Sequence, residues 1–178
     1  AERRAEFVAA GLVLIFSSPT AVRIADSKRE TLELCEQLGV RAPAFRIVRG
    51  GSELAAAARE LGYPDRIVCM KPAVSVGSRG FHVLAADVDE RHWLLDERPV
   101  APPRRLEDVE RILDGDDTEL LVMEFMHGIE RTVDGYAEGG RIVFGHPKTR
   151  EALRAGLAMR FETLDDPELT RTTATILE

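Results

Sequence analysis

Lysine is rare in this chain, and its three positions are the first residues that could carry chemistry. The 178 residues include 24 basic side chains, of which Lys28, Lys71 and Lys148 are the lysines. Lys71 ends an apolar run and directly precedes Pro72. Burying an ammonium group costs several kcal/mol unless an anion compensates for the lost hydration. Lys71 therefore lies either in water at the mouth of a strand or against a negatively charged ligand.

The segment after Lys71 has the composition of a loop that can approach a phosphate group. Ser75, Gly77, Ser78 and Gly80 lie between two expected strands, and glycine leaves room for backbone N–H groups to contact an anion. No Lys-Ser or Lys-Thr pair follows, so the segment is not a P-loop. Taken alone, an ordinary hairpin connection is the better interpretation, whereas beside Lys71 the segment favours phosphate binding.

A third group of residues could bind the rest of a nucleotide. An apolar strand delivers Glu124, Phe125 and Met126, and the glycine turn after it delivers Glu130. Backbone N–H and C=O groups can bind the edge of an adenine ring, and a carboxylate can accept hydrogen bonds from ribose hydroxyls. Without context, an amphipathic strand with solvated acids is the stronger interpretation.

Hydrophobic spacing, caps and turn residues define the elements that must position these groups. Helices and strands alternate up to about residue 125, and Glu138-Gly139-Gly140 then joins two alternating segments as a hairpin. This mixture predicts an α+β chain with antiparallel strands rather than a doubly wound parallel sheet. The expected helices are 2–10, 17–25, 27–38, 53–61 with Ser52 as its N-cap, 87–95, 106–113 and 167–177, and the expected strands are 12–16, 45–48, 66–72, 81–84, 119–126, 131–137 and 141–144.

Composition narrows the class of protein. Hydrophobic residues make up 44% of the chain, which suits a globular fold. The net charge of −7, from 31 acidic and 24 basic side chains, argues against a protein that coats nucleic acid. No apolar run reaches the ~18 residues of a membrane span, and we expect a cytoplasmic protein. Cys35 and Cys69 are far apart in the sequence and predict buried free thiols.

The ordered set of these motifs resembles the ATP-grasp superfamily, in the branch of carbamoyl-phosphate synthase and related carboxylate–amine ligases. Each motif is common alone, whereas their order and spacing are specific. The resemblance runs from residue 7 to residue 178 and rests on Asp26-Ser27-Lys28 at the head of a helix, Cys69-Met70-Lys71-Pro72, the segment 75–80, and Val122 to Met126 with Gly128-Ile129-Glu130.

The resemblance implies a role for each group of residues. Lys28 and Lys71 would bind the ATP phosphates, and residues 75–80 would close over the triphosphate. The adenine hinge would be Glu124, Phe125 and Met126, and Glu130 would bind the ribose. Lys148 and Arg150 resemble the basic segment that faces the transferred phosphate or the substrate, and they are the candidate catalytic residues. Exposed bases at the end of a strand are the alternative interpretation of that pair.

The same resemblance implies a metal site that the sequence does not supply. ATP-grasp proteins bind Mg²⁺ with an acidic residue on one late strand and a Glu-x-Asn run on another, and this chain contains no Asn. No metal ligand is assigned here, and the Mg²⁺ ligands are expected outside the chain. Asp165, Asp166 and Glu168 are expected at the start of a helix, where carboxylates favour the dipole.

The expected architecture is an ATP-grasp lid subdomain plus the first part of the larger subdomain, truncated at both ends. Residues 1–26 would be the remnant of a preceding Rossmann-like domain. Residues 27–123 would form the lid and small subdomain, and residues 124–178 the adenine hinge and the start of the larger subdomain.

The implied function is the ATP-binding segment of an enzyme that forms an acylphosphate from a carboxylate and ATP and ligates it to an amine. A non-catalytic nucleotide-binding or interaction module and a kinase-like phosphotransferase are the alternatives. The segment alone is expected to be inactive as a ligase. The expected partners are ATP with a small carboxylate and amine, without nucleic acid or membrane, and homodimerisation stays open.

Overall fold

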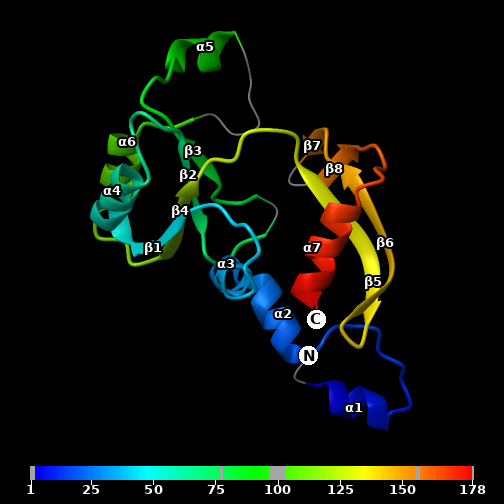
Figure 1. The fold of residues 1–178 in the computed structure, drawn as a ribbon. Coiled ribbons are helices and arrows are strands. Elements are labelled where there is room, and N and C mark those ends of the chain that lie inside the picture. Colours follow the sequence, from blue (N-terminus) through cyan, green and yellow to red (C-terminus); the bar gives the residue numbers. More distant parts are fainter. Residues whose placement is uncertain (1–2, 77, 97–102, 155–156, 178) are drawn as a thin grey trace.

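A computed structural model describes residues 3–76, 78–96, 103–154 and 157–177 (Figure 1). The chain is α+β with antiparallel sheets, as the sequence predicts. Its elements in order are α1 (Arg4–Ala9), α2 (Pro19–Asp26), α3 (Lys28–Gln37), β1 (Phe45–Arg49), α4 (Gly50–Glu60), β2 (Val68–Pro72), β3 (His82–Leu84), α5 (Glu90–Leu95), α6 (Leu106–Ile112), β4 (Glu119–Glu124), β5 (Arg131–Glu138), β6 (Arg141–Thr149), β7 (Ala152–Arg154), β8 (Leu157–Arg160) and α7 (Pro167–Leu177).

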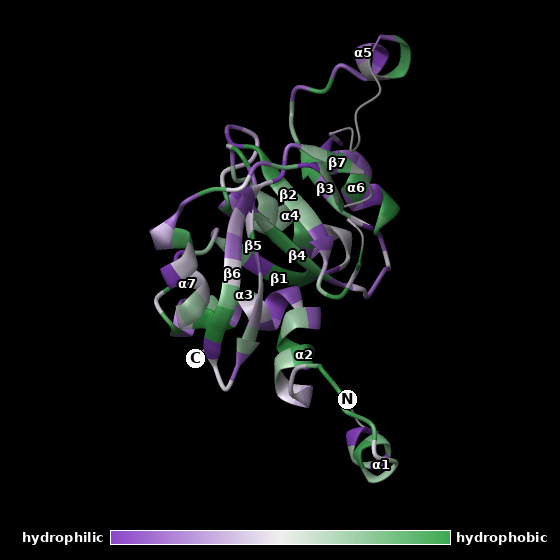
Figure 2. Cartoon of the chain, turned by 90° about the vertical axis from the view of Figure 1, so that its right-hand side faces the viewer, coloured by the Kyte–Doolittle hydropathy of each residue, from purple (hydrophilic) through white to green (hydrophobic). Residues whose placement is uncertain are grey.

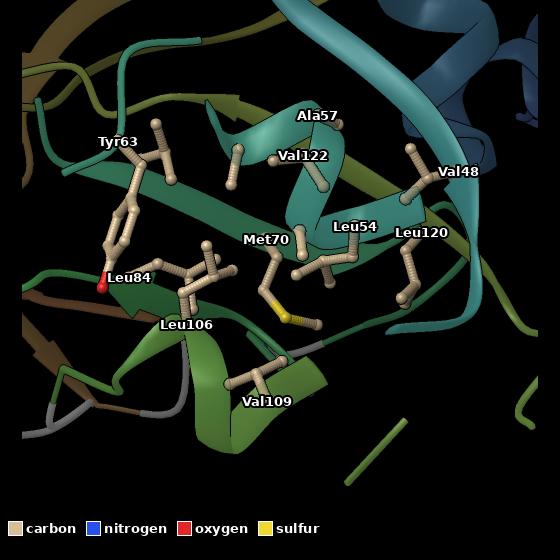
Figure 3. Close-up of a cluster of buried hydrophobic side chains, with 13 residues drawn as sticks. Val48, Leu54, Ala57, Tyr63, Met70, Leu84, Leu106, Val109, Leu120 and Val122 are labelled. Carbon is tan, nitrogen blue, oxygen red and sulfur yellow. The ribbon is translucent and has the colours of Figure 1, made fainter. Parts of the chain in front are cut away.

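A four-stranded antiparallel sheet in the order β1-β4-β2-β3 forms the first half of the structure. Helices α4 and α6 cover one of its faces, where Val68, Met70 and Val122 meet the fully buried Leu54 and Leu106 (Figure 3). Burying a leucine of this kind contributes roughly 1.5–3 kcal/mol. This core fixes the strands β2 and β4 relative to each other, and these strands carry residues of the candidate site.

The opposite face of the same sheet carries Lys71. Cross-strand partners point to the same face, and Lys71 pairs with Leu121 while Cys69 pairs with Met123. Cys69, Leu121 and Met123 form a second buried cluster, against which Leu32 of α3 packs. The sheet therefore presents its lysine on an apolar face that α3 partly covers.

The second half of the structure is the β5–β6 hairpin, against which α7 packs. Gly139 and Gly140 both have positive φ, at 56° and 77°, which is the backbone that a two-residue hairpin turn needs and which glycine adopts at no steric cost. The predicted hairpin is thus confirmed. The short β7–β8 hairpin that follows was not expected from the sequence. Figure 1 shows β4 leading through one connecting segment into β5.

The buried strand expected at residues 12–16 is wrong. This segment is irregular and exposed, and the side chains of Val13 and Ile15 are 91% and 81% accessible. Figure 2 shows the segment as a hydrophobic stretch between α1 and α2. An apolar run becomes a buried strand only beside another strand, and none of the described strands pairs with it.

The start of α4 also differs from expectation. The helix begins at Gly50, before Ser52, and the carboxylate of Glu53 accepts a hydrogen bond from the backbone N–H of Arg49 at 2.7 Å. Ser52 is therefore not the N-cap. Ser18 and Ser27 do cap α2 and α3 through their hydroxyls, as their positions predict.

Among the described residues, the helices are too short or too polar to cross a membrane.

Candidate functional site

Lys28 lies at the first turn of α3 and holds the base of the 75–80 loop. Its backbone N–H donates to the carbonyl of Ala73 at 3.0 Å, and its Nζ donates to the carbonyl of Ser75 at 2.7 Å. The hydroxyl of Ser27 caps the same helix by accepting from the N–H of Glu30. Lys28 thus fixes the segment that follows β2, through both its backbone N–H and its side chain.

Lys71 is half-buried at the end of β2, close to Lys28. Burial lowers the pKa of Lys71, Cys69 opposes this shift, and the positive charge of Lys28 lowers it further. Burial also lowers the pKa of Lys28, which the carboxylate of Asp26 partly offsets. Among the described residues, neither ammonium group forms an ion pair. Two adjacent cations without a carboxylate partner make a site with the charge and position to receive an anion.

Lys148 has a different environment from the other two lysines. Its ammonium group forms an ion pair with Asp134 and lies 4.5 Å from the ring centroid of Phe161. Its side chain is 18% accessible. The structure thus neutralises this lysine through an ion pair, whereas Lys28 and Lys71 form no ion pair with the described residues.

The loop between β2 and β3 turns sharply where glycine allows it. Gly80 has φ of +74°, and a Cβ at this position would lie 2.6 Å from Cδ of Pro72. Ser78 is exposed and also has positive φ, at 58°, which is strained for a residue with a side chain. Ser75 is half-buried beside Lys28, whereas Gly77 lies outside the described residues. The loop therefore begins against Lys28 and ends against Pro72, the residue after Lys71.

The predicted adenine hinge is the segment that leaves β4. Glu124 is exposed at the end of that strand, Phe125 packs against the second buried cluster, and Met126 is 54% accessible. The backbone N–H groups of Glu124 and Phe125 donate to the carbonyls of Ala44 and Ile67. Within the described residues, the backbone N–H and C=O of Met126 make no hydrogen bond. Met126 is thus where this segment offers its backbone to a ligand.

Glu130 precedes β5 and forms an ion pair with Arg150, across the hairpin. The structure brings these two predicted residues together, and it brings Lys28, Lys71 and Ser75 together separately. Among the described residues, no hydrogen bond or ion pair joins the two groups: the first lies on α3 and β2 and the second at the ends of β5 and β6. Figure 1 shows the connecting segment that runs between these two parts. A pocket of about 740 Å³ lies elsewhere, between β6 and α7.

The described residues contain no group of three or more His, Cys, Asp or Glu side chains placed to hold a metal ion. Asp166 instead caps α7 by accepting from the N–H of Leu169 at 3.0 Å, and it pairs with Arg131 at 2.8 Å. The prediction that this carboxylate serves the start of a helix is confirmed.

Both cysteines are free and buried, as predicted. Burial raises the pKa of the Cys69 thiol to about 11, although the nearby charge of Lys71 opposes the shift. At pH 8 the native thiolate fraction should be about a hundredfold below that of a thiol with the ordinary pKa. In a Cys35→Ser variant, Cys69 should react with a disulfide reagent far more slowly than after unfolding in urea. Equal rates in both conditions would contradict the assigned burial.

The same shift has a consequence for stability. The unfolded chain loses the thiol proton at lower pH than the native chain does, because the native pKa is higher. The free energy of unfolding should therefore fall as the pH rises from about 9 towards 11. Removing the thiol by Cys69→Ala should reduce this pH dependence.

The sequence of this chain is similar to part of several longer proteins. No family model matches the chain. The carbamoyl phosphate synthase large chain of Xanthomonas axonopodis pv. citri is 30% identical over 127 residues, which cover 64% of this chain and 12% of that protein. The corresponding chain of Pseudomonas syringae pv. tomato is 25% identical over 138 residues, covering 77% and 11%. This chain thus spans about an eighth of the length of the curated relatives it matches.

Solved structures share the fold over nearly the whole chain. A RimK domain protein ATP-grasp from Sphaerobacter thermophilus matches with a TM-score of 0.59 at 19% identity, over 99% of this chain and 59% of that one. The chain therefore shares the fold of ATP-grasp proteins. D-alanyl-alanine synthetase A from Vibrio cholerae matches with a TM-score of 0.59 at 13% identity, over 98% and 53%. An ADP complex of N5-carboxyaminoimidazole ribonucleotide synthetase matches with 0.56 at 12% identity, over 85% and 37%.

The partners of Lys148 were not predicted from the sequence. Asp134 and Phe161 hold its ammonium group, and the two belong to β5 and to the segment after β8. The register set by the Gly139-Gly140 turn alone would place Lys148 opposite Arg131, on the other face from Asp134. The bulge between Tyr136 and Ala137 shifts the pairing by one residue, so that Thr132 lies opposite Lys148 and Asp134 diagonally beside it. No sequence pattern pointed to this bulge or to Phe161, which reaches Lys148 through the unexpected β7–β8 hairpin.

Proposed function

We propose that the chain binds an adenine nucleotide, with its phosphates between Lys28 and Lys71. The observation that carries this proposal is a pair of neighbouring, partly buried ammonium groups that form no ion pair with the described residues, with only a partial offset of the Lys28 charge by Asp26. Their lowered pKa values mean that the native site disfavours its own charge, and a polyphosphate would relieve this cost. The Nζ of Lys28, which now donates to the carbonyl of Ser75, would exchange this acceptor for a phosphate oxygen of the ligand.

The remaining parts of the nucleotide would lie along the connecting segment. The unbonded N–H and C=O of Met126 suit N1 and the N6 amino group of adenine, and Glu130 is placed further along to accept from the ribose hydroxyls. Residues 27–123 would then act as the lid and small subdomain, and residues 124–178 as the hinge and the start of the larger subdomain. Residues 1–26 would be what remains of a preceding domain.

The activity proposed for the whole protein is ATP-dependent carboxylate–amine ligation. A carboxylate oxygen attacks the γ-phosphorus, the bond to the β-phosphate oxygen breaks, and ADP leaves. The amine then attacks the acyl carbon and displaces inorganic phosphate. The lysines of this chain would contribute by holding the phosphate charge in place while these bonds change. The relatives named as carbamoyl phosphate synthases and the ligase fold support this proposal.

Mg²⁺ is expected with the nucleotide, because it commonly bridges phosphate oxygens in such sites. The described residues do not fit a metal site, so its ligands are expected outside this chain and no step is assigned to it. Lys148 and Arg150 were predicted to face the transferred phosphate. The ion pairs that both make favour supporting roles for them over direct contact with the phosphate.

Nucleotide binding by the 178-residue chain tests the proposal. We expect titration calorimetry to detect ADP, and to give an affinity for ADP at least about tenfold above that for GDP. Guanine carries a proton donor at N1 where adenine carries an acceptor, so the Met126 N–H would face another donor. Equal affinities for ADP and GDP would contradict the hinge assignment, and no binding of either would contradict the proposed function.

The second candidate function is a nucleotide-binding module without catalysis. It is favoured by one observation, the lack of a metal-binding cluster in the described residues. Formation of ADP by this chain, dependent on an added carboxylate and on Mg²⁺, would exclude it.

A further inference from the structure

Arg150 and Glu130 face each other just beyond the last pair of the β5–β6 ladder, which is Arg131 with Thr149. The backbone N–H of Arg150 donates to the carbonyl of Glu130 at 2.8 Å, so the two main chains stay paired at this point. The guanidinium Nη1 also donates to Oε1 of the Glu130 carboxylate. Glu130 is thus fixed through its backbone and through one carboxylate oxygen.

The two side chains of this pair differ in exposure. The Arg150 side chain is 22% accessible, whereas that of Glu130 is 51% accessible. No described group bonds to the second oxygen of the carboxylate, Oε2. The arginine is therefore the more buried partner, and the more exposed carboxylate keeps one oxygen without a hydrogen bond to the described residues. A carboxylate has about four lone-pair sites and can accept from a guanidinium and from a ligand at the same time.

We infer that Arg150 is a positioning residue for ribose recognition, acting through Glu130 rather than on the transferred phosphate. This inference rests on the proposed function. The guanidinium limits the rotamers of Glu130, so that Oε2 can accept from the 2′- and 3′-hydroxyls without first losing conformational freedom. The contribution of Arg150 should therefore appear only when the ligand carries those hydroxyls.

The hairpin offers a matched control for removing this arginine. Arg131 lies on β5 directly after Glu130, and its guanidinium pairs with Asp166 at 2.8 Å, away from the Glu130 carboxylate. Arg131→Met removes the same charge from the same hairpin as Arg150→Met does. Only the second change breaks the ion pair with Glu130.

The experiment compares the affinities for ADP and for 2′,3′-dideoxy-ADP by titration calorimetry. The unmodified chain should prefer ADP by about tenfold or more, as expected for hydrogen bonds to a charged acceptor. Glu130→Gln should abolish most of this preference. Arg150→Met should reduce it to about threefold or less while leaving the affinity for the dideoxy compound unchanged, and Arg150→Lys should restore part of it. Arg131→Met should preserve the full preference.

Three results would overturn the inference or its basis. Equal losses for both nucleotides in Arg150→Met would mean that Arg150 acts on the phosphates, and the inference would fail. A preference lost in Glu130→Gln but kept in Arg150→Met would also overturn it, while leaving the ribose assignment intact. If the unmodified chain bound neither nucleotide, the proposed function itself would fail, and the inference with it. Circular dichroism melting of each variant, with Arg150→Lys as the milder change, separates these results from misfolding.

Discussion

Replacing Lys71 by methionine is expected to weaken ADP binding by about tenfold to a hundredfold. The ammonium group is half-buried, forms no ion pair with the described residues and lies beside Lys28. A hydrogen bond between charged groups contributes roughly 1.5–3 kcal/mol, which corresponds to this range of affinity. Titration calorimetry at neutral pH measures the effect.

The same substitution should not destabilise the protein. The native state lowers the pKa of Lys71, so folding disfavours its charge, and methionine removes this cost while filling a similar volume. We therefore expect a free energy of unfolding equal to or above that of the unmodified chain, measured by urea denaturation. Arg46→Met is the control, because Arg46 forms an exposed ion pair with Glu60 at 2.9 Å. Equal weakening of ADP binding in both variants would argue against a specific role for Lys71.

Gly51→Ala is expected to cost about 3 kcal/mol or more of the free energy of unfolding. A Cβ at residue 51 would lie 2.1 Å from the carbonyl oxygen of Glu110 and 3.0 Å from its Cα. Both contacts are with the backbone of α6, which cannot move aside as a flexible side chain would. The α4–α6 pair covers the core face of the sheet, so the strain reaches the strands that position Lys71.

Ser52→Ala provides the matched control for this substitution. Ser52 is the next residue of α4, it is exposed, and it does not cap the helix. Alanine has a higher helix propensity than serine, so this variant should be as stable as the unmodified chain or slightly more stable. Chemical denaturation followed by circular dichroism distinguishes the two outcomes. A loss below about 1 kcal/mol in Gly51→Ala would mean that the two helices can separate cheaply.

The elements that local signals define were predictable from the sequence. Ser27 caps α3, and the two glycines at 139 and 140 set the β5–β6 turn, because both act within one turn of the chain. The strand expected at 12–16 failed for a different reason. An apolar pattern reports which residues avoid water, but it does not report whether a partner strand lies beside them.

The residues of the candidate site were named from the sequence and stay a prediction, whereas the contacts that these residues make could not be predicted from the sequence. The position of Lys71 at the end of an apolar strand predicted an ammonium group in surroundings that disfavour its charge. In the structure, burial lowers the pKa of Lys71, as expected for such surroundings. The contrast between Lys71 and Lys148 could not be foreseen, because it depends on Phe161, which a short hairpin of weak pattern brings back to β6. Burial and pairing are properties of the folded neighbourhood, and residue type alone does not determine them.

The single connecting segment between β4 and β5 has a mechanical consequence. In the described part of the chain, residues 125–130 are the one covalent crossing from the four-stranded sheet to the hairpin (Figure 1). A single connection of this kind limits the distance between the two parts but restrains their relative orientation only weakly. A molecule that contacts both halves would add a second link between them. A nucleotide gripped at both Lys71 and Glu130 would act as such a brace.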